Sequence, residues 1–270
     1  MKKFAVFGNP IAHSLSPAIH KMFAENTGEE IDYGIVESDI DAFESDIETF
    51  FTQDNVVGCN VTAPFKGRAY ELSKNNCNAE AKTAEAVNTL FMKDGTLLGY
   101  TTDGMGLVAD LHSQVGSLVG HTVLLLGAGG ATRGVVEPLL GAKVKGLYIN
   151  NRTEIKAQAI VDAIKSPVFE CVSKNDLTSL QPDIVINCTS ASLTGDLPQV
   201  STSVFKRCSL AYDMVYGKGE TRFMEFAKTH GAKKVSDGFG MLVEQAAAAF
   251  TIWTGKKPDT AKVIEALRPR

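Results

Sequence analysis

The feature that most constrains the fold is a glycine-rich stretch directly after a short apolar segment. Thr122–Leu126 predicts a buried strand, and Gly127–Ala131 follows it without a spacer. Further strand-like segments then recur between helix-like ones, at Val144–Asn150, Val168–Val172, Asp183–Cys188, Leu210–Val215 and Lys233–Ser236. Strands that alternate with helical segments are typical of parallel β-α-β units. The second half of the chain therefore predicts an α/β fold with a doubly wound parallel sheet.

The first half alternates in the same way and adds a hairpin. Ser16-Pro17 indicates an N-cap followed by proline at the first helical position, and Gly28 is the expected C-terminal stop of that helix. Asp39–Gln53 predicts a second helix with Ile40, Phe43, Ile47, Phe50 and Phe51 on one stripe. The remaining expected elements are strands at Lys3–Gly8, Ile31–Glu37 and Val56–Val61, helices at Pro64–Lys74, Asn78–Ala86 and Gly104–Val115, and a hairpin of Val87–Lys93 and Thr96–Thr101.

The length and the C-terminal pattern predict two domains. At about 150 residues per domain, 270 residues favour two. We expect one domain at residues 1–103 and a second at 104–240. Two further helices, about Met241–Thr254 and Asp259–Leu267, are expected to pack back on the first domain within residues 241–270.

Charge and composition exclude several classes of function. The net charge of −4 argues against a nucleic-acid-binding surface. No apolar run approaches the 18 residues of a membrane helix, and the apolar run after Met1-Lys2-Lys3 is too short for a signal peptide, so we expect a cytoplasmic protein. The five cysteines are odd in number and contain no C-x-x-C pair, which favours reduced thiols. The five histidines lack ligand spacing, so we expect no metal.

The glycine stretch predicts a site for a dinucleotide. Gly127 and Gly129 match the first two glycines of G-x-G-x-x-G, and Thr132 occupies the third position. A turn of this kind places backbone N–H groups and a helix N-terminus beside a phosphate. The alternative is a plain glycine-rich turn between a strand and a helix.

The end of the second strand indicates which dinucleotide. An NAD site has an acid at this tip for the ribose 2′-hydroxyl, whereas the chain has Asn151, Arg152 and Thr153, with Lys156 one turn later. Arg152 can make a bidentate contact with a 2′-phosphate, which favours NADP. The alternative is a solvated Arg and Lys at the start of a helix.

Polar side chains also follow the strands of the first half. Ser14 and Ser16 follow the first strand, and Asn88 and Asp103 flank the hairpin. The third strand contributes Asn60, Thr62 and Lys66. Open α/β sheets bind their ligands at the carboxyl ends of strands. Each residue also has a structural alternative, such as an N-cap for Ser16 and Asp103, a solvated side chain for Lys66, or a turn residue for Asn88.

Several segments together resemble the shikimate dehydrogenase family, in order and over nearly the whole chain. They are Val6-Phe7-Gly8-Asn9-Pro10-Ile11-Ala12-His13-Ser14-Leu15-Ser16-Pro17, Gly58-Cys59-Asn60-Val61-Thr62-Ala63-Pro64-Phe65-Lys66, Ala86-Val87-Asn88-Thr89, Thr102-Asp103-Gly104, Gly127–Ala131, Asn151-Arg152-Thr153, and Asp237-Gly238-Phe239-Gly240-Met241-Leu242-Val243-Glu244-Gln245-Ala246-Ala247. Enzymes of this family reduce 3-dehydroshikimate to shikimate with NADPH, on the route to chorismate and the aromatic amino acids.

The resemblance implies a substrate-binding N-terminal domain, a Rossmann-type NADP-binding domain and a role for each matched residue. Lys66 and Asp103 would be the catalytic acid–base pair. The substrate would be bound by Ser14, Ser16, Thr62, Lys66, Asn88, Asp103, Tyr216 and Gln245. The cofactor would be bound by Gly127, Ala128, Gly129, Gly130, Ala131, Asn151, Arg152, Thr153, Lys156, Met214 and Gly238. We expect a small-molecule substrate, no nucleic-acid or membrane partner, and a monomer or homodimer.

Three positions depart from the pattern of the family. Glu85 replaces a usual glycine, Thr101 a usual asparagine, and Ser192-Leu193 a common Gly-Met. Three other functions stay open: a sister enzyme that acts on quinate or uses NAD, another two-domain NADP enzyme such as a methylenetetrahydrofolate dehydrogenase, and a catalytically silent NADP-binding regulator.

Overall fold

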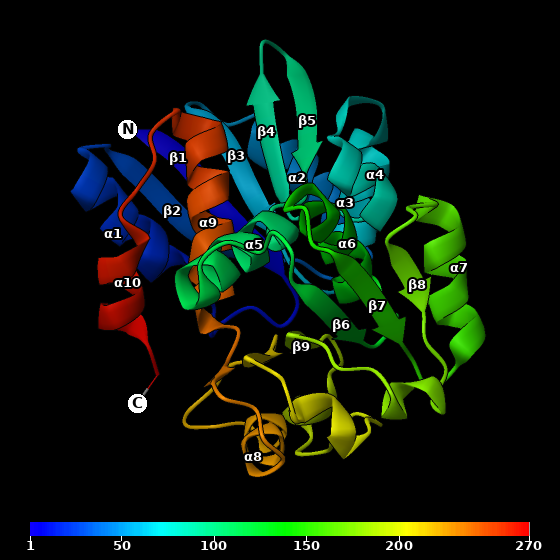
Figure 1. Ribbon diagram of the computed structural model, residues 1–270. Coiled ribbons are helices and arrows are strands. Elements are labelled where there is room, and N and C mark those ends of the chain that lie inside the picture. Colours follow the sequence, from blue (N-terminus) through cyan, green and yellow to red (C-terminus); the bar gives the residue numbers. More distant parts are fainter. Residues whose placement is uncertain (270) are drawn as a thin grey trace. The chain divides into compact units, whose positions relative to one another are not determined.

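The computed structural model describes residues 1–269 and divides the chain into two compact units (Figure 1). Unit 1 contains residues 1–106 and 243–267, and unit 2 contains residues 107–242 with the last residues of the chain. The chain passes between them within two helices, α5 (Asp103–Val115) and α9 (Phe239–Thr254). Unit 1 is therefore built from two separate segments of the sequence.

Unit 1 contains a five-stranded mixed sheet in the order β2-β1-β3-β4-β5. The strands are β1 (Lys2–Gly8), β2 (Ile31–Glu37), β3 (Val56–Val61), β4 (Thr89–Lys93) and β5 (Thr96–Tyr100). Strands β1, β2 and β3 are parallel, and β4 runs antiparallel to both β3 and β5. The β4–β5 turn is Asp94-Gly95, and both residues have positive φ, as a tight two-residue hairpin requires.

Helices cover both faces of this sheet. The helices are α1 (Ser16–Thr27), α2 (Phe43–Phe51), α3 (Lys66–Ser73), α4 (Ala79–Ala84), α10 (Thr260–Leu267) and the unit 1 part of α9. Phe7 packs with Phe43 and Phe50 of α2 on one face. Phe4 packs with Trp253 of α9 on the other, because successive residues of a strand point to opposite faces.

Unit 2 contains a six-stranded parallel sheet in the order β11-β10-β9-β6-β7-β8. The strands are β6 (Thr122–Leu126), β7 (Gly146–Asn150), β8 (Phe169–Cys171), β9 (Ile184–Asn187), β10 (Leu210–Asp213) and β11 (Val235–Ser236). Counted from β6, this is the 3-2-1-4-5-6 order of the doubly wound dinucleotide-binding fold. The predicted α/β fold class is confirmed.

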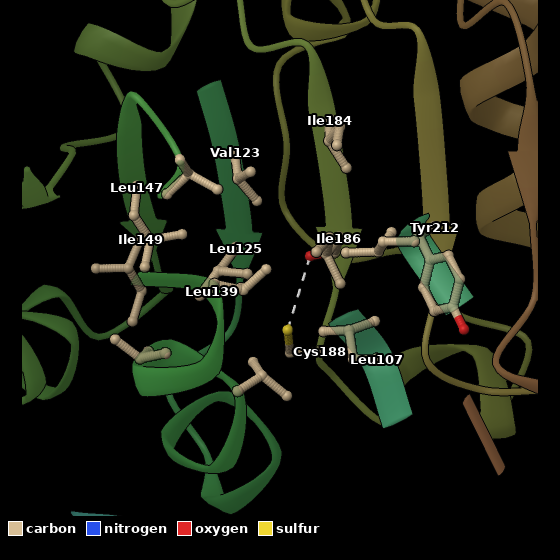
Figure 2. Packing of buried hydrophobic residues seen from close by; sticks show 14 of the residues in the cluster. Leu107, Val123, Leu125, Leu139, Leu147, Ile149, Ile184, Ile186, Cys188 and Tyr212 are labelled. Atoms are coloured by element: carbon tan, nitrogen blue, oxygen red, sulfur yellow. Dashed lines mark hydrogen bonds between the residues drawn. The ribbon is translucent and has the colours of Figure 1, made fainter. Parts of the chain in front are cut away.

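Both faces of the unit 2 sheet are buried. Val123 and Leu125 of β6 face a core that includes Leu107 and Leu139, from α5 and from α6 (Gly130–Gly141) (Figure 2). Leu124 and Leu126 face the opposite cluster, to which α8 (Arg222–Thr229) and short 3-10 turns contribute. A strand buried on both faces has a continuous apolar sequence, which is why Val123–Leu126 shows no alternation.

The structure corrects two local expectations. Ser16 is not an N-cap: α1 begins at Ser16 itself, after Leu15, and the Ser16 N–H donates to Oγ of Ser14 at 3.3 Å. Helix α2 begins at Phe43 rather than at Asp39, and Ile40 is 52% exposed, so it does not belong to the buried stripe. Ile40 lies on a turn that precedes the helix, so the helical spacing of apolar residues does not predict its burial.

Residues 187–210 join two parallel strands without an α-helix. Among the described residues, this crossover from β9 to β10 contains only the 3-10 turns η3 (Ala191–Leu193) and η4 (Thr202–Phe205). Within residues 1–269, no helix is long and apolar enough to cross a membrane, and no group of three or more His, Cys, Asp or Glu side chains could hold a metal ion.

Candidate functional site

Strand direction brings the polar residues of unit 1 to one edge of the sheet. Strands β1, β3 and β5 point the same way, and β4 runs opposite to them. The carboxyl ends of β3 and β5 therefore meet the amino end of β4, where Asn88 precedes the strand. Lys66 begins α3 after β3, and Asp103 begins α5 after β5. The alternating directions of these strands thus bring residues from three separate segments of the sequence to one edge of the sheet.

Lys66 and Asp103 form a close ion pair. Lys66 Nζ lies 2.7 Å from Asp103 Oδ2, and their side chains are 34% and 24% exposed. A cation in the first turn of a helix opposes the helix dipole, whereas a carboxylate there is favoured. Lys66 is the first residue of α3, so the Asp103 carboxylate offsets an otherwise unfavourable position. The half-exposed pair can still reach a bound molecule.

Asn88 connects this pair to neighbouring groups. Its Nδ2 group donates to Asp103 Oδ1 at 2.9 Å, to Thr102 Oγ1 at 3.0 Å and to Gln245 Oε1 at 3.2 Å. Its Oδ1 atom accepts from the Thr102 N–H at 2.9 Å. The Asp103 carboxylate is thereby fixed from both sides, by an ammonium and by an amide. Four predicted site residues, Lys66, Asn88, Asp103 and Gln245, lie together.

A buried support lies beneath Asn88; it contains Asn60, which the sequence pattern identified after the third strand, and Tyr33 and Thr89, which it did not identify. Asn60 Nδ2 donates to the Asn88 carbonyl and to Thr89 Oγ1, each at 3.1 Å, and Tyr33 OH donates to Asn60 Oδ1 at 2.7 Å. Asn60 and Thr89 are buried. The sequence does contain a signal for this support, since each of the two apolar strands β3 and β4 includes a polar residue. A buried amide or hydroxyl group requires a hydrogen-bond partner, so each of these residues indicates a buried polar contact.

Thr62 directly follows β3, Ser14 lies in the segment between β1 and α1, and Ser16 begins α1; all three side chains are half-buried. The Thr62 N–H donates to the Phe7 carbonyl at 2.9 Å, which places Thr62 beside the end of β1. A Cβ at Gly8 would overlap the Thr62 side chain, so glycine is what permits this approach. Ser14 and Ser16 are linked by the hydrogen bond described above.

The glycine turn of unit 2 is open on the side of its helix. Gly127 has φ of 109°, which favours glycine, and α6 begins at Gly130 after the N-cap Gly129. A Cβ added at Gly129 or Gly130 would meet no atom within 4 Å. Thr132, at the third motif position, is buried, and its hydroxyl donates to the Gly127 carbonyl at 2.8 Å. This hydrogen bond holds the glycine turn against the first turn of α6.

A cavity of about 720 Å³ adjoins this turn. Three predicted cofactor residues line it, Gly127, Asn151 and Arg152. Thr153 and Lys156, which lie at the start of α7 (Glu154–Ile164), are exposed and do not line the cavity. The loop after β9 supplies Thr189, Ser190 and Ala191, which the sequence analysis did not name as site residues. The sequence feature that could have identified this loop is the one that identified the other site residues, namely polar residues soon after a buried strand.

Met214 and Gly238 are neighbours in unit 2. A Cβ at Gly238 would overlap the Met214 carbonyl group, and the Gly238 N–H donates to the Val215 carbonyl at 3.3 Å. Glycine at 238 therefore permits the close approach of two loops. Tyr216 is 37% exposed and packs edge-on against Phe239, and burial raises the pKa of its phenol. Its predicted contact with the substrate stays a prediction.

Comparisons with known proteins agree over both units. Three family models match the chain: "Shikimate dehydrogenase substrate binding domain" at residues 6–90, "Shikimate / quinate 5-dehydrogenase" at 110–207 and "Shikimate 5'-dehydrogenase C-terminal domain" at 238–268. A curated relative from Alteromonas mediterranea, "Shikimate dehydrogenase (NADP(+))", is 49% identical, with 99% of this chain and 96% of the relative covered. The chain belongs to the shikimate dehydrogenase family.

Solved structures of other proteins align with nearly the whole chain. The crystal structure of an Ael1 enzyme from Pseudomonas putida aligns with a TM-score of 0.96 at 41% identity, and covers 100% of this chain and 99% of that one. Shikimate 5-dehydrogenase from Thermus thermophilus, in complex with NADP(H) and shikimate, aligns with a TM-score of 0.84 at 33% identity and covers 98% of each chain. The predicted membership of the shikimate dehydrogenase family, which is an oxidoreductase family, is confirmed.

Proposed function

We propose that this protein catalyses the reversible, NADPH-dependent reduction of 3-dehydroshikimate to shikimate, with Lys66 and Asp103 as the acid–base pair. The observation that carries the proposal is the 2.7 Å contact between Lys66 Nζ and Asp103 Oδ2 at the half-exposed edge of the unit 1 sheet. The names of the curated relative and of the Thermus complex support the substrate and the cofactor.

The residues of unit 1 suit a small ring that bears a carboxylate, a ketone and hydroxyls. Ser14 and Ser16 lie before and at the start of α1, whose first N–H groups lack partners within the helix, so this end suits the carboxylate. Thr62, Asn88 and Gln245 offer hydroxyl and amide groups for the ring hydroxyls. Tyr216 is proposed as a further contact.

The reaction adds a hydride to the ketone carbon and a proton to its oxygen. NADPH, when bound, supplies the hydride. Lys66 carries the proton as an ammonium, donates it as negative charge develops on the oxygen, and is held towards Asp103 throughout. Positioned proton transfer of this kind contributes about 10²–10⁴-fold to the rate. In the reverse direction, neutral Lys66 accepts the proton of the alcohol.

Unit 2 fits NADP. The open backbone at Gly129 and Gly130 leaves room for a pyrophosphate beside the N-terminus of α6, with Ala128 and Ala131 on the same turn. Arg152 lines the cavity and is proposed to contact the 2′-phosphate, with Asn151, Thr153 and Lys156 around it. Met214 and Gly238 are proposed to lie near the nicotinamide.

The test is an assay of the purified protein with shikimate and NADP⁺, in which absorbance follows the formation of NADPH. Parallel reactions with quinate and with NAD⁺ test the sister activity. Arg152→Ala should weaken NADP⁺ binding by about 1–3 kcal/mol, the scale of a charge-assisted hydrogen bond, and leave NAD⁺ binding nearly unchanged. No oxidation of shikimate with either cofactor would overturn the proposal.

A cytoplasmic location and a monomeric or homodimeric state belong to the same proposal. Both rest on the sequence and on the family. Sedimentation of the purified protein tests the second, and a larger assembly would contradict it.

A further inference from the structure

The segment from Thr189 to Leu193, directly after the buried Cys188, lies beside the nucleotide cavity and has little apolar anchorage of its own. Thr189, Ser190 and Ala191 line the cavity, and the next apolar side chain, Leu193, is 72% exposed. Since burial of Leu193 does not hold the loop, its position depends on polar contacts. These contacts converge on a residue that the proposed reaction does not use.

Asp213, the last residue of β10, is fully buried and accepts four hydrogen bonds. Its Oδ1 atom accepts from Asn187 Nδ2 and from the Val215 N–H, each at 3.1 Å. Its Oδ2 atom accepts from Ser192 Oγ at 2.6 Å and from Thr221 Oγ1 at 2.7 Å. A buried carboxylate requires partners of this kind, because an unpaired charge is costly to bury.

Two of these donors fix the two ends of the cavity loop. Asn187 Oδ1 accepts from the N–H and the hydroxyl of Thr189, at 3.0 and 2.7 Å. Ser192 holds the far end of the same loop. Burial raises the pKa of Asp213, and the hydrogen bond from Ser192 is the contact that opposes this rise most. Thr189 in turn lies against Gly127, where an added Cβ would meet its methyl group at 2.9 Å.

We infer that Ser192, through its hydrogen bond to Asp213, is a positioning residue that holds the loop of Thr189–Ala191 in the form that binds the nucleotide. The inference rests on the proposed function, since it takes NADP as the ligand of the cavity. Of the two hydroxyl groups that donate to Asp213 Oδ2, only that of Ser192 belongs to the loop that follows β9.

The test is the binding of NADP⁺, measured by calorimetry on the full chain. Ser192→Ala should raise the Kd about tenfold, the effect of one lost hydrogen bond to a charged group. Ser192→Thr keeps the hydroxyl and should bind like the unaltered chain. In the assay, Ser192→Ala should raise KM for NADP⁺ and leave KM for shikimate unchanged.

Thr122→Val is the matched control. It removes a hydroxyl that donates to another carboxylate of unit 2, Asp183 Oδ2, at 2.8 Å, and neither residue lines the cavity. It should lower the melting temperature and change the Kd by less than about twofold. The inference is overturned if Ser192→Ala binds NADP⁺ normally, or if Thr122→Val weakens binding as much. Failure of the unaltered chain to bind NADP⁺ would overturn the proposed cofactor as well as the inference.

Discussion

Single residues of unit 1 show how the proposed acid–base pair, Lys66 and Asp103, is kept in place. Lys66 is held by Asp103, and Asp103 is held in turn by Asn88, whose own side chain contacts Thr102 and Gln245. The Asp103 carboxylate thus has a charged partner and a neutral one on different oxygens. Removal of either member of the ion pair leaves the other with an unmatched charge.

Lys66 and Asp103 should therefore behave as one unit in catalysis. Lys66→Ala and Asp103→Asn should each lower kcat by roughly 10²–10⁴-fold while the protein stays folded. The double variant should be little worse than the worse single variant, because groups that act together are not additive. Steady-state kinetics of the four proteins provides the measurement. Losses that multiply would show that the two residues act independently.

Glu85, one of the departures from the family pattern, has a backbone conformation that lowers the stability of the folded chain. It follows α4 with φ of 51° and ψ of 38°, a left-handed conformation that glycine adopts without strain. The Glu85 side chain is exposed.

Glu85→Gly should stabilise the protein by roughly 0.5–1 kcal/mol. The left-handed conformation costs about 1–2 kcal/mol for a residue with a Cβ, and the added freedom of glycine in the unfolded chain returns about 0.5–1 kcal/mol of this. Differential scanning calorimetry measures the shift in melting temperature. The matched variant is Lys82→Gly in the middle of α4, which should destabilise. A lower melting temperature for Glu85→Gly would contradict the prediction.

At the scale of elements, Trp253 makes a close contact between helix α9 and the sheet of unit 1. Its ring packs on Phe4, and its Nε1–H donates to the Leu90 carbonyl at 3.0 Å. A Cβ at Gly58 of β3 would overlap both the indole nitrogen and that carbonyl oxygen. Glycine at 58 is therefore required for α9 to lie on this face of the sheet.

Gly58→Ala should displace Trp253 and destabilise unit 1 by about 1–3 kcal/mol, because overpacking is added to a lost hydrogen bond. Trp253 is the only tryptophan of the chain, so its fluorescence reports this contact directly. We expect a red-shifted emission in the folded variant and an earlier midpoint in urea. Gly34→Ala on β2 is the control, since a Cβ there meets only the Phe4 carbonyl oxygen, at 4.0 Å. Equal behaviour of the two variants would contradict the role of Gly58.

Elements were predictable from sequence where pattern and boundary signals are local. The parallel sheet of unit 2 follows from apolar runs between helices, and the hairpin from Asp94-Gly95. The crossover after β9 was not predictable, because its first 3-10 turn, η3, is held by a hydrogen bond from Ser192 to Asp213, which lies 21 residues further along the chain. Contacts between residues far apart in the sequence also limit what can be predicted of the site. Strand ends identified Lys66, Asn88 and Asp103, whereas the support from Asn60 and Tyr33 depends on contacts across the sheet.

At the scale of the whole molecule, stability should depend on pH through one buried histidine. His20 of α1 is fully buried, stacks on Tyr33 with ring centroids 4.3 Å apart, and makes no hydrogen bond of normal length through either ring nitrogen among the described residues. Burial lowers its pKa to about 3, and the nearby Asn60 side chain offsets only part of this change.

The unfolded chain, with an ordinary histidine pKa near 6.5, binds a proton below that pH, whereas the folded chain does so only near pH 3. Stability should therefore fall as pH drops through this window, by about 2 kcal/mol from pH 7 to pH 5 for this group alone. His20→Phe keeps an aromatic ring and should remove this part of the dependence, as measured by urea unfolding at each pH. His112→Gln, at an exposed position of α5, should leave the dependence unchanged. An unaltered acid slope in His20→Phe would exclude His20 as its source.

The split of unit 1 into residues 1–106 and 243–267 has a consequence for the order in which the protein is made. A ribosome releases the chain from its N-terminus, and domains usually fold in that order. Here the five strands of unit 1 emerge first but lack α9, so Phe4, Val57 and Phe91 have no tryptophan to cover them. The continuous segment of unit 2, residues 107–242, is synthesised 25 residues before Leu267, the last residue of unit 1. The half of the protein that begins first thus waits for its final helices until the main segment of the other half has been made.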